Sequence, residues 1–272
     1  MNQYLDLVKT VLNKGTKRTN RTGVDTIMYF GYHYKVDLQN GFPLLTTKKV
    51  FFNSVVHELL WYLKGETHIR NLRNHTKIWD AWTSEDKNWE IGKMYGYQWV
   101  NWEKFSKDSK TGEIRKTYIN QIQDVIDLIK NNPDSRRMVV TAWNPSVLDE
   151  IALPSCHAFF IFSVTNGKLN CHLTQRSGDI ALGIPFNLAC YATLTQMIAQ
   201  ETNLGLGEFS HYINDAHIYE NHIDGLKEQL KRDPLDLPKL KIKEKPFWNL
   251  EFEDFELCNY EHHPVIKFPV AV

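Results

Sequence analysis

Residues 158–174, AFFIFSVTNGKLNCHLT, give the clearest indication of the fold. Two strand-like segments, 158–164 and 168–174, flank the pair Asn166-Gly167. This pair tolerates the positive φ angles of a type I′ turn, whose twist suits two antiparallel strands. The sequence therefore predicts a β-hairpin here, and we expect the rest of a sheet to build onto it.

The segments around this hairpin mix helical and strand patterns without a regular β-α-β alternation. Alternating or continuous apolar residues predict strands over 26–37 and 138–143. Apolar residues at helical spacing predict helices over 1–14, 54–63, 118–130 and 186–200, with Ser54 as the cap of the second. Residues 83–116 are polar and irregular, and we expect loops there. The pattern favours an α+β fold in a single domain over residues 1–272, with a large mixed or antiparallel sheet flanked by helices.

Composition narrows the class of protein. Hydrophobic residues make up 42% and charged residues 24% of the 272 residues, which excludes a disordered chain or a coiled coil. The 32 Lys and Arg balance 32 Asp and Glu, so the basic excess of a general nucleic-acid binder is missing. No apolar run approaches the ~20 residues of a membrane span, and the N-terminus lacks the layout of a signal peptide. Four cysteines without a CxxC pair or Cys/His cluster indicate reduced thiols in the cytoplasm and no metal.

Cys156 is the cysteine whose surroundings best suit a nucleophile. It lies in LPSCHAFF, between a proline turn and an apolar strand, where a thiol is exposed at the mouth of the strand. A nearby guanidinium would favour the thiolate, which is the reactive form. Inert burial is the alternative for Cys156, and it is what we expect for Cys171, Cys190 and Cys258.

Arginine residues recur in segments that are expected to be loops. Arg136 and Arg137 follow a predicted helix, Arg176 and Ser177 follow the hairpin, and Arg21 precedes the first long strand. A guanidinium binds two phosphate oxygens at once, and a serine hydroxyl adds a further donor. The pattern indicates an anionic pocket, with surface solubility as the alternative for any single arginine.

Glu58 lies in the strongly apolar helix VVHELLWYL. A carboxyl at the edge of a buried helix face has a raised pKa and can transfer protons. The alternative is a surface glutamate whose stem alone is covered.

Two further features suit the binding of a ligand. The amide of Asn187 offers one donor and one acceptor, which matches N3–H and O4 of uracil, although a helix cap is the alternative role. His217 and Tyr219 are two residues apart, so on a strand they would project from the same face and hold one ligand group.

The chain resembles the thymidylate synthase family over nearly its whole length. The resemblance rests on motifs that agree in order and spacing: NRTG, HELLWYLKG, DSRRMVVTAWN, LPSCHAFFIF, QRSGDIALGIPFNLACY and NDAHIY. It implies the reductive methylation of deoxyuridylate to thymidylate, with 5,10-methylenetetrahydrofolate as the donor of carbon and hydride.

The resemblance also implies roles for individual residues. Cys156 corresponds to the nucleophile that adds to C6 of the uracil ring. The group expected to take part in catalysis comprises Cys156, Glu58, Tyr95, His157, Arg176 and Asn187. The group expected to bind the nucleotide comprises Arg21, Arg176, Ser177, Asp179, Asn187, His217 and Tyr219, with Arg136 and Arg137 donated by the second subunit of a homodimer. The group expected to hold the folate comprises Ile78, Trp79, Trp82, Asp179, Gly183, Phe186 and Ala271.

Some positions depart from the family pattern. Ser155, Ala181 and Asn214 stand where proline, phenylalanine and glycine are common, and Phe51 and Asn53 replace residues that help to hold the folate tail. These departures concern the folate grip and fine geometry rather than the nucleotide chemistry.

Two alternative functions remain at this point. One is a hydroxymethylase of the same fold acting on deoxyuridylate, in which water rather than hydride reacts in the last step; cytidylate is disfavoured by Asn187. The other is a non-catalytic RNA-binding or regulatory relative, for which the loss of Cys156, Arg176 or Asn187 would be the signature.

Overall fold

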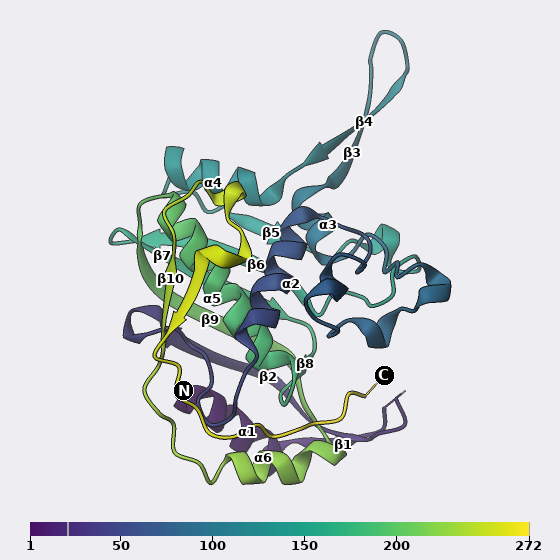
Figure 1. The fold of residues 1–272 in the computed structure, drawn as a ribbon. Helices are drawn as coiled ribbons and strands as arrows, with labels where there is room; N and C mark the ends of the chain where they lie inside the picture. Colours follow the sequence, from purple (N-terminus) through teal and green to yellow (C-terminus); the bar gives the residue numbers. More distant parts are fainter. Residues whose placement is uncertain (21, 272) are drawn as a thin grey trace.

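The computed structural model describes residues 1–20 and 22–271. A large mixed sheet forms the centre of the fold, and its strands run in the order β1-β2-β9-β7-β6-β5, with β8 beside β9 (Figure 1). Their bounds are β1 Thr16–Arg18, β2 Thr26–Asp37, β5 Val139–Thr141, β6 His157–Thr165, β7 Lys168–Gln175, β8 Gly178–Asp179 and β9 Gly205–Tyr219. β7 and β8 run parallel to β9, and the other neighbours are antiparallel. The predicted α+β fold with a mixed sheet is confirmed.

The hairpin predicted from residues 158–174 is the β6–β7 pair. Asn166 and Gly167 have φ angles of 50° and 69°, as a type I′ turn requires. Thr165 pairs with Lys168 directly across this turn, and the register continues to His157 and Gln175 at the other end. The hairpin therefore brings the residues before β6 and after β7 to one edge of the sheet.

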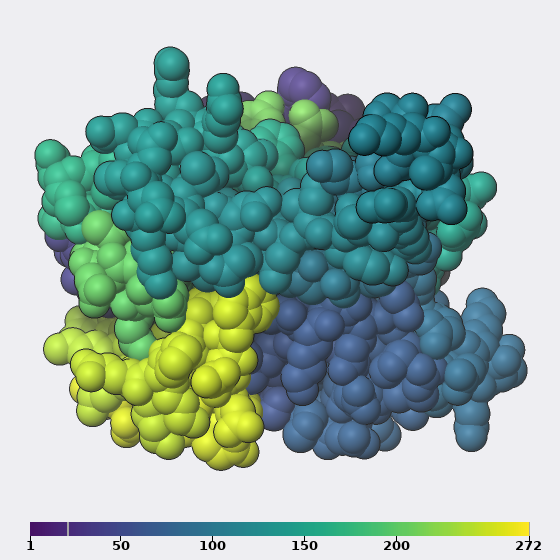
Figure 2. Space-filling view, turned by 90° about the horizontal axis from the view of Figure 1, so that it is seen from above, coloured from purple at the N-terminus to yellow at the C-terminus, as the bar shows by residue number. Residues whose placement is uncertain are grey.

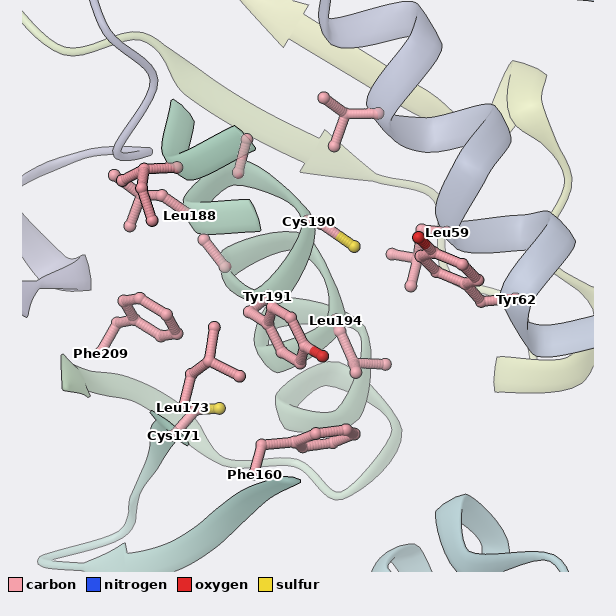
Figure 3. Close-up of a cluster of buried hydrophobic side chains, with 14 of the residues drawn as sticks. Leu59, Tyr62, Phe160, Cys171, Leu173, Leu188, Cys190, Tyr191, Leu194 and Phe209 are labelled. Carbon is pink, nitrogen blue, oxygen red and sulfur yellow. The ribbon is translucent and has the colours of Figure 1, made fainter. Parts of the chain in front are cut away.

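The helices are α1 Asn2–Lys14, α2 Phe52–Lys64, α3 Tyr95–Val100, α4 Gln121–Asn131, α5 Gly183–Glu201 and α6 Ile223–Gln229. α5 is buried on nearly all sides because it packs on β7 and β9 on one side and on α2 on the other. Figure 3 shows side chains of α5, including Tyr191 and Leu194, between Leu59 and Tyr62 of α2 and Phe160 of the sheet. The layers are therefore sheet, α5, and α2 with α3.

Two small hairpins complete the fold. β3 Trp102–Lys107 pairs with β4 Ile114–Ile119 and projects away from the body of the molecule (Figure 1). β10 Lys239–Ile242 pairs with β11 Phe255–Cys258. The segment between β10 and β11 lies against α2, where Phe252 stacks on His57 with 4.0 Å between ring centres. Figure 2 shows this yellow C-terminal part in contact with the blue part that contains α2.

Three sequence-based expectations are wrong. α2 begins at Phe52, not after Ser54, and no side chain caps it; burial of Phe52 and its neighbours stabilises this end instead. The helix predicted over 118–130 begins at Gln121, because the preceding residues belong to β4 and Asn120 caps the helix by accepting from the backbone N–H of Gln123. Residues 83–116 are not only loops, since they contain α3, β3 and the start of β4.

Candidate active site

Cys156 lies immediately before β6, and Arg176 lies immediately after β7. Because these two strands are hydrogen-bonded neighbours, the two side chains meet at the sheet edge. The backbone N–H of Arg176 donates to the carbonyl of Cys156 at 2.8 Å, and its guanidinium Nη2 lies 3.5 Å from the Cys156 Sγ. The Nε of Arg176 donates to the Ser155 carbonyl at 2.9 Å, which orients the guanidinium. The arrangement offers the sulfur a charge-assisted hydrogen bond.

The other cysteines differ from Cys156 in their surroundings. Cys171 and Cys190 are fully buried in the core, where Figure 3 shows them among apolar side chains. Burial raises the pKa of Cys171 to about 12 and that of Cys190 well above its ordinary value. Cys258 lies in β11, and the four thiols form no disulfide. The structure thus separates Cys156 from Cys171 and Cys190, whose thiols stay protonated at neutral pH.

Tyr95 and His157 hold the backbone of Cys156 from one side. The Tyr95 hydroxyl accepts a hydrogen bond from the Cys156 N–H at 2.8 Å, and its ring stacks on His157 with 3.9 Å between centres. His157 Nδ1 lies 2.7 Å from the Tyr191 hydroxyl, and burial lowers the His157 pKa to about 3. His157 is therefore neutral at physiological pH and serves as a fixed polar wall. Tyr95 has a φ of 28°, a strained backbone of the kind that concentrates at functional sites.

Glu58 lies on the buried face of α2, near Tyr95. Its Oε1 accepts a hydrogen bond of 2.7 Å from the indole of Trp79, and only 7% of the residue is exposed. Burial raises the pKa of Glu58 to about 7, partly offset by hydrogen bonds from Trp79 and Tyr62. The raised pKa expected from the apolar helix is thus present, and the carboxyl can exchange a proton near neutral pH.

Asn187 lies within the first two turns of α5. The N-cap of this helix is Leu182, so the alternative role of Asn187 as a helix cap is excluded. Its Oδ1 accepts a hydrogen bond of 2.9 Å from Nε2 of Gln175, the last residue of β7. Asn187 and Cys156 therefore flank the same end of the β6–β7 hairpin.

The strand β8 brings Asp179 beside His217. These two residues are partners in the parallel β8–β9 pair, and Ser177 lies immediately before β8. His217 and Tyr219 lie on the same face of β9 as predicted, with perpendicular rings 5.2 Å apart. Asp179 Oδ1 accepts from the backbone N–H groups of Ala181 and Leu182, which shapes the turn into α5. The site is thus lined from β6, β7, β8, β9 and α5.

A comparison with protein-family models matches residues 2–272 to the model described as thymidylate synthase. The chain belongs to the thymidylate synthase family. The resemblance drawn from the separate motifs is therefore confirmed over essentially the whole chain, and the family is one of methyltransferases of nucleotide biosynthesis.

Aromatic residues next to Glu58 form the side of the site where the thymidylate synthase resemblance expects the folate. Trp79 is buried with its ring 5.3 Å from that of Trp82, while Ile78 and Phe186 are half-buried against the core. A Cβ on Gly183 would lie 3.7 Å from Asn187 Oδ1, so this glycine lies beside the base-reading candidate. An apolar wall of aromatic side chains suits a flat heterocycle.

The C-terminal tail of this thymidylate synthase family member reaches the same side. His222 Nε2 lies 2.7 Å from the Pro269 carbonyl, and His222 Nδ1 lies 3.7 Å from Asp179. Ala271 follows two residues later and is half-buried. Phe51 and Asn53 are exposed, whereas Lys48 is buried and donates to the Ala181 carbonyl.

Some predicted residues lie apart from this group. Arg136 and Arg137 are exposed in the loop between α4 and β5, where they line a concavity with Leu128 and Asn132. Arg21 lies outside the described residues. Among residues 1–20 and 22–271, no group of three or more His, Cys, Asp or Glu side chains is arranged to hold a metal ion.

Sequence reasoning missed Gln175 and Tyr191, which contact Asn187 and His157. Both lie inside the quoted motif QRSGDIALGIPFNLACY, but only their three-dimensional contacts distinguish them from neighbouring residues.

None of the helices in the described part of the chain combines the length and apolar character that crossing a membrane requires.

Proposed function

We propose that the protein is a thymidylate synthase, which converts deoxyuridylate to thymidylate with 5,10-methylenetetrahydrofolate as the donor of carbon and hydride. The observation that carries the proposal is the pairing of the Cys156 thiol with the Arg176 guanidinium at 3.5 Å, in a site where Tyr95 interacts with both Cys156 and the carboxyl of Glu58. A thiolate, an anion-binding cation and a carboxyl that titrates near neutral pH are the groups that addition to a pyrimidine ring needs.

Cys156 acts as the nucleophile in this proposal. The sulfur forms a bond to C6 of the uracil ring, and the electron pair of the C5–C6 double bond makes C5 nucleophilic. The hydrogen bond from the Cys156 N–H to Tyr95 and the carbonyl contacts of Arg176 hold the reacting loop in place. Such fixed groups lower the barrier because little reorganisation is needed during the reaction.

The nucleotide lies along the hairpin edge. Arg176, Ser177 and Arg21 bind its phosphate, because guanidinium and hydroxyl donors suit phosphate oxygens. His217 and Tyr219 bind the deoxyribose hydroxyl from the same face of β9. Asn187 binds the base edge, with its amide nitrogen donating to O4 and its amide oxygen accepting from N3–H.

Glu58 transfers protons in this proposal. With a pKa of about 7, it is partly protonated and partly ionised under physiological conditions, so it can release a proton toward the base and take one back. The neutral His157 cannot replace it as an acid, because its pKa is about 3.

The residues present fit a reduced folate as co-substrate. The wall formed by Trp79, Trp82 and Phe186 would hold its ring, and Asp179 would accept from the ring's polar edge. When bound, the folate supplies the one-carbon unit and the hydride. The chain supplies orientation and excludes water, since Trp79 is only 6% exposed.

The proposal includes a homodimer in which Arg136 and Arg137 of the partner subunit complete the phosphate site. The sheet face opposite α5 supports it, because β5 and β6 display apolar side chains there. Ile161 pairs with Val139 across β5–β6, Phe159 lies two residues away, and Val139 is 42% exposed in a single chain. A sheet face of this kind needs a covering layer, and a second copy provides one. Reduced thiols in all four cysteines fit an enzyme of the cytoplasm.

The test is incubation with deoxyuridylate and 5,10-methylenetetrahydrofolate, followed by dihydrofolate absorbance and nucleotide analysis. We expect dihydrofolate and thymidylate to appear together in equal amounts. Consumption of the folate with a 5-hydroxymethyl nucleotide and no dihydrofolate would show the hydroxymethylase instead. If neither nucleotide product forms, the result would favour a binding protein.

A further inference from the structure

A chain of buried polar side chains runs from Asn187 into the core. Gln175 Nε2 lies 2.9 Å from Asn187 Oδ1, Gln175 Oε1 lies 2.9 Å from His211 Nε2, and His211 Nδ1 lies 2.8 Å from the Tyr34 hydroxyl. Gln175, His211 and Tyr34 are 2%, 0% and 6% exposed. Buried polar groups that are fully paired restrict the side chains they connect, so this chain can orient the Asn187 amide.

The sheet register explains why these residues meet. Tyr34 of β2 and His211 of β9 are direct cross-strand partners, so their side chains share one face of the sheet. β7 lies on the other side of β9 and ends at Gln175, which pairs with Ile213. The shared face is the one that packs on α5, where Figure 3 shows Phe209 and Leu173 in the core. Asn187 reaches this face from α5.

The direction of the hydrogen bonds follows from the chemistry of the groups. Burial is the main cause that lowers the His211 pKa to about 3, and His172 and His33 lower it further. The imidazole is therefore neutral and carries one proton. Either direction would connect the chain, because an amide or an imidazole can turn or change tautomer. A phenol is a stronger donor than a neutral imidazole N–H, and an imidazole nitrogen is a stronger acceptor than a phenol oxygen. Tyr34 therefore donates to Nδ1, and the proton of His211 is on Nε2.

This direction has a consequence at the other end. With its proton on Nε2, His211 donates to Gln175 Oε1, and the Gln175 amide nitrogen must then face Asn187 and donate to its Oδ1. The Asn187 oxygen keeps one lone pair, and its amide nitrogen keeps its donors. The free pattern of one acceptor and one donor is complementary to uracil, whereas the reversed chain would present the pattern for cytosine at the same positions.

We propose that Tyr34 and His211 are positioning residues for base specificity: they fix the orientation of the Asn187 amide through Gln175. The inference rests on the proposed function, in which Asn187 reads the base. In this proposal neither residue touches the nucleotide. Their effect therefore appears in the ratio of kcat/KM for deoxyuridylate to kcat/KM for deoxycytidylate, rather than in the absolute rate. If the direction of the hydrogen bonds is not fixed, the amides of Gln175 and Asn187 can flip together, and the site can then bind either base.

The first experiment measures kcat/KM for deoxyuridylate and deoxycytidylate in the wild type, His211→Leu, His211→Gln and Tyr34→Phe. We expect the preference for deoxyuridylate to fall at least about tenfold in His211→Leu, since one well-formed buried hydrogen bond accounts for roughly that factor. His211→Gln keeps an amide donor near the Nε2 position and should retain more of the preference. Tyr34→Phe removes one oxygen and should lower the ratio about threefold or more. Asn187→Asp serves as the reference for direct loss of base reading.

A merely structural role would lower both rates together and leave their ratio unchanged in every variant, which would overturn the inference. If His211→Leu does not fold, Tyr34→Phe decides, because it changes a single buried atom. A wild type without preference between the nucleotides would overturn the proposed function and this inference together. A wild type with a preference that the folded variants keep would overturn the inference alone.

The second experiment is independent of activity. Nitrogen NMR of labelled wild-type protein distinguishes a protonated imidazole nitrogen from a bare one, and His211→Gln identifies the signals by their disappearance. We expect His211 with a protonated Nε2 and a bare Nδ1, and we expect Tyr34→Phe to weaken this preference. A proton on Nδ1 in the wild type would contradict the proposed direction of the chain.

Discussion

At the scale of single residues, the chemistry of the site depends on how burial changes the ionisation of neighbouring groups. Burial has opposite effects on two of them: it raises the pKa of Glu58 to about 7 and lowers that of His157 to about 3. The carboxyl becomes a proton carrier near neutral pH, and the imidazole becomes a permanently neutral hydrogen-bonding group. Of the two groups, only the carboxyl can thus exchange a proton near neutral pH.

The raised pKa of Glu58 predicts a pH-dependent stability. Between its ordinary pKa of 4.5 and about 7, the folded protein binds more protons at this site than the unfolded chain, so stability falls as pH rises through that window. The difference amounts to about 3 kcal/mol above the window. Glu58→Gln has no charge to titrate at this position. As the pH rises from about 5 to about 8, we therefore expect its free energy of unfolding to increase by about that amount relative to that of the wild type.

Urea denaturation of both proteins across this pH range measures the effect. Glu113→Gln in the exposed β3–β4 turn is the control and should leave the pH dependence of the wild type unchanged. Parallel stability curves for the wild type and Glu58→Gln would show that the carboxyl does not titrate in this window.

At the scale of elements, the close contact of α2 and α3 determines where Tyr95 lies. A Cβ on Gly96 would overlap the backbone of Tyr62, so only glycine allows α3 to approach α2 this closely. The same contact sets Tyr95 against Tyr62, with 5.3 Å between their ring centres, and against His157. The helix pair therefore positions the hydroxyl that binds the Cys156 backbone.

Gly96→Ala is expected to separate the two helices. Because backbone atoms rather than a flexible side chain oppose the added methyl group, we expect a loss of about 2–3 kcal/mol in the free energy of unfolding. Turnover should fall as well, since Tyr95 moves with α3. Gly205→Ala in β9 is the matched control, because its Cβ would meet its nearest neighbour at an ordinary 3.4 Å. Equal stabilities for the two variants would mean that α3 can shift freely.

The sequence predicted those elements whose determinants are local. The β6–β7 hairpin follows from Asn166-Gly167 and the flanking residues, and β2 was predicted with its observed ends. The helix over 118–130 was placed too early because Ile119 fits the apolar spacing of α4, yet Ile119 belongs to β4 and pairs with Trp102 of β3. Sequence spacing cannot distinguish the last residue of a strand from the first turn of a helix when both are apolar.

The candidate site was predictable to a similar extent. Cys156 and Arg176 were found because each is adjacent in sequence to a strand of one recognisable hairpin. The chain from Tyr34 to Asn187 was not found, since it depends on pairing between β2, β9 and β7. His211 looks like an ordinary core histidine until both of its nitrogens are seen to have partners.

At the scale of the whole molecule, the proposed phosphate site draws on two chains. Arg136 and Arg137 are exposed at the end of α4, and the sheet face that carries Phe159 and Ile161 is only half-buried. A symmetric pair of chains would cover that face and bring each arginine pair to the other subunit. The proposed site would then be shared between chains.

Mixed dimers test the shared site. Arg137→Ala and Cys156→Ala homodimers should each be nearly inactive, because each lacks one component in both sites. After subunit exchange, the mixed dimer contains one site with both components, so we expect up to about a quarter of wild-type activity from random mixing. Confirmed exchange without recovery of activity would contradict the shared site. A monomer in sedimentation experiments on the wild type would contradict the dimer itself.

The most direct test of the account is the covalent adduct at Cys156. The 5-fluoro analogue of deoxyuridylate blocks removal of the C5 substituent, so incubation with it and 5,10-methylenetetrahydrofolate should trap the nucleotide on the protein. Mass spectrometry of the intact chain and of its peptides is expected to show one adduct, on the peptide that contains Cys156, and none on Cys156→Ser. An adduct on Cys171, Cys190 or Cys258, or full turnover by Cys156→Ser, would contradict the account.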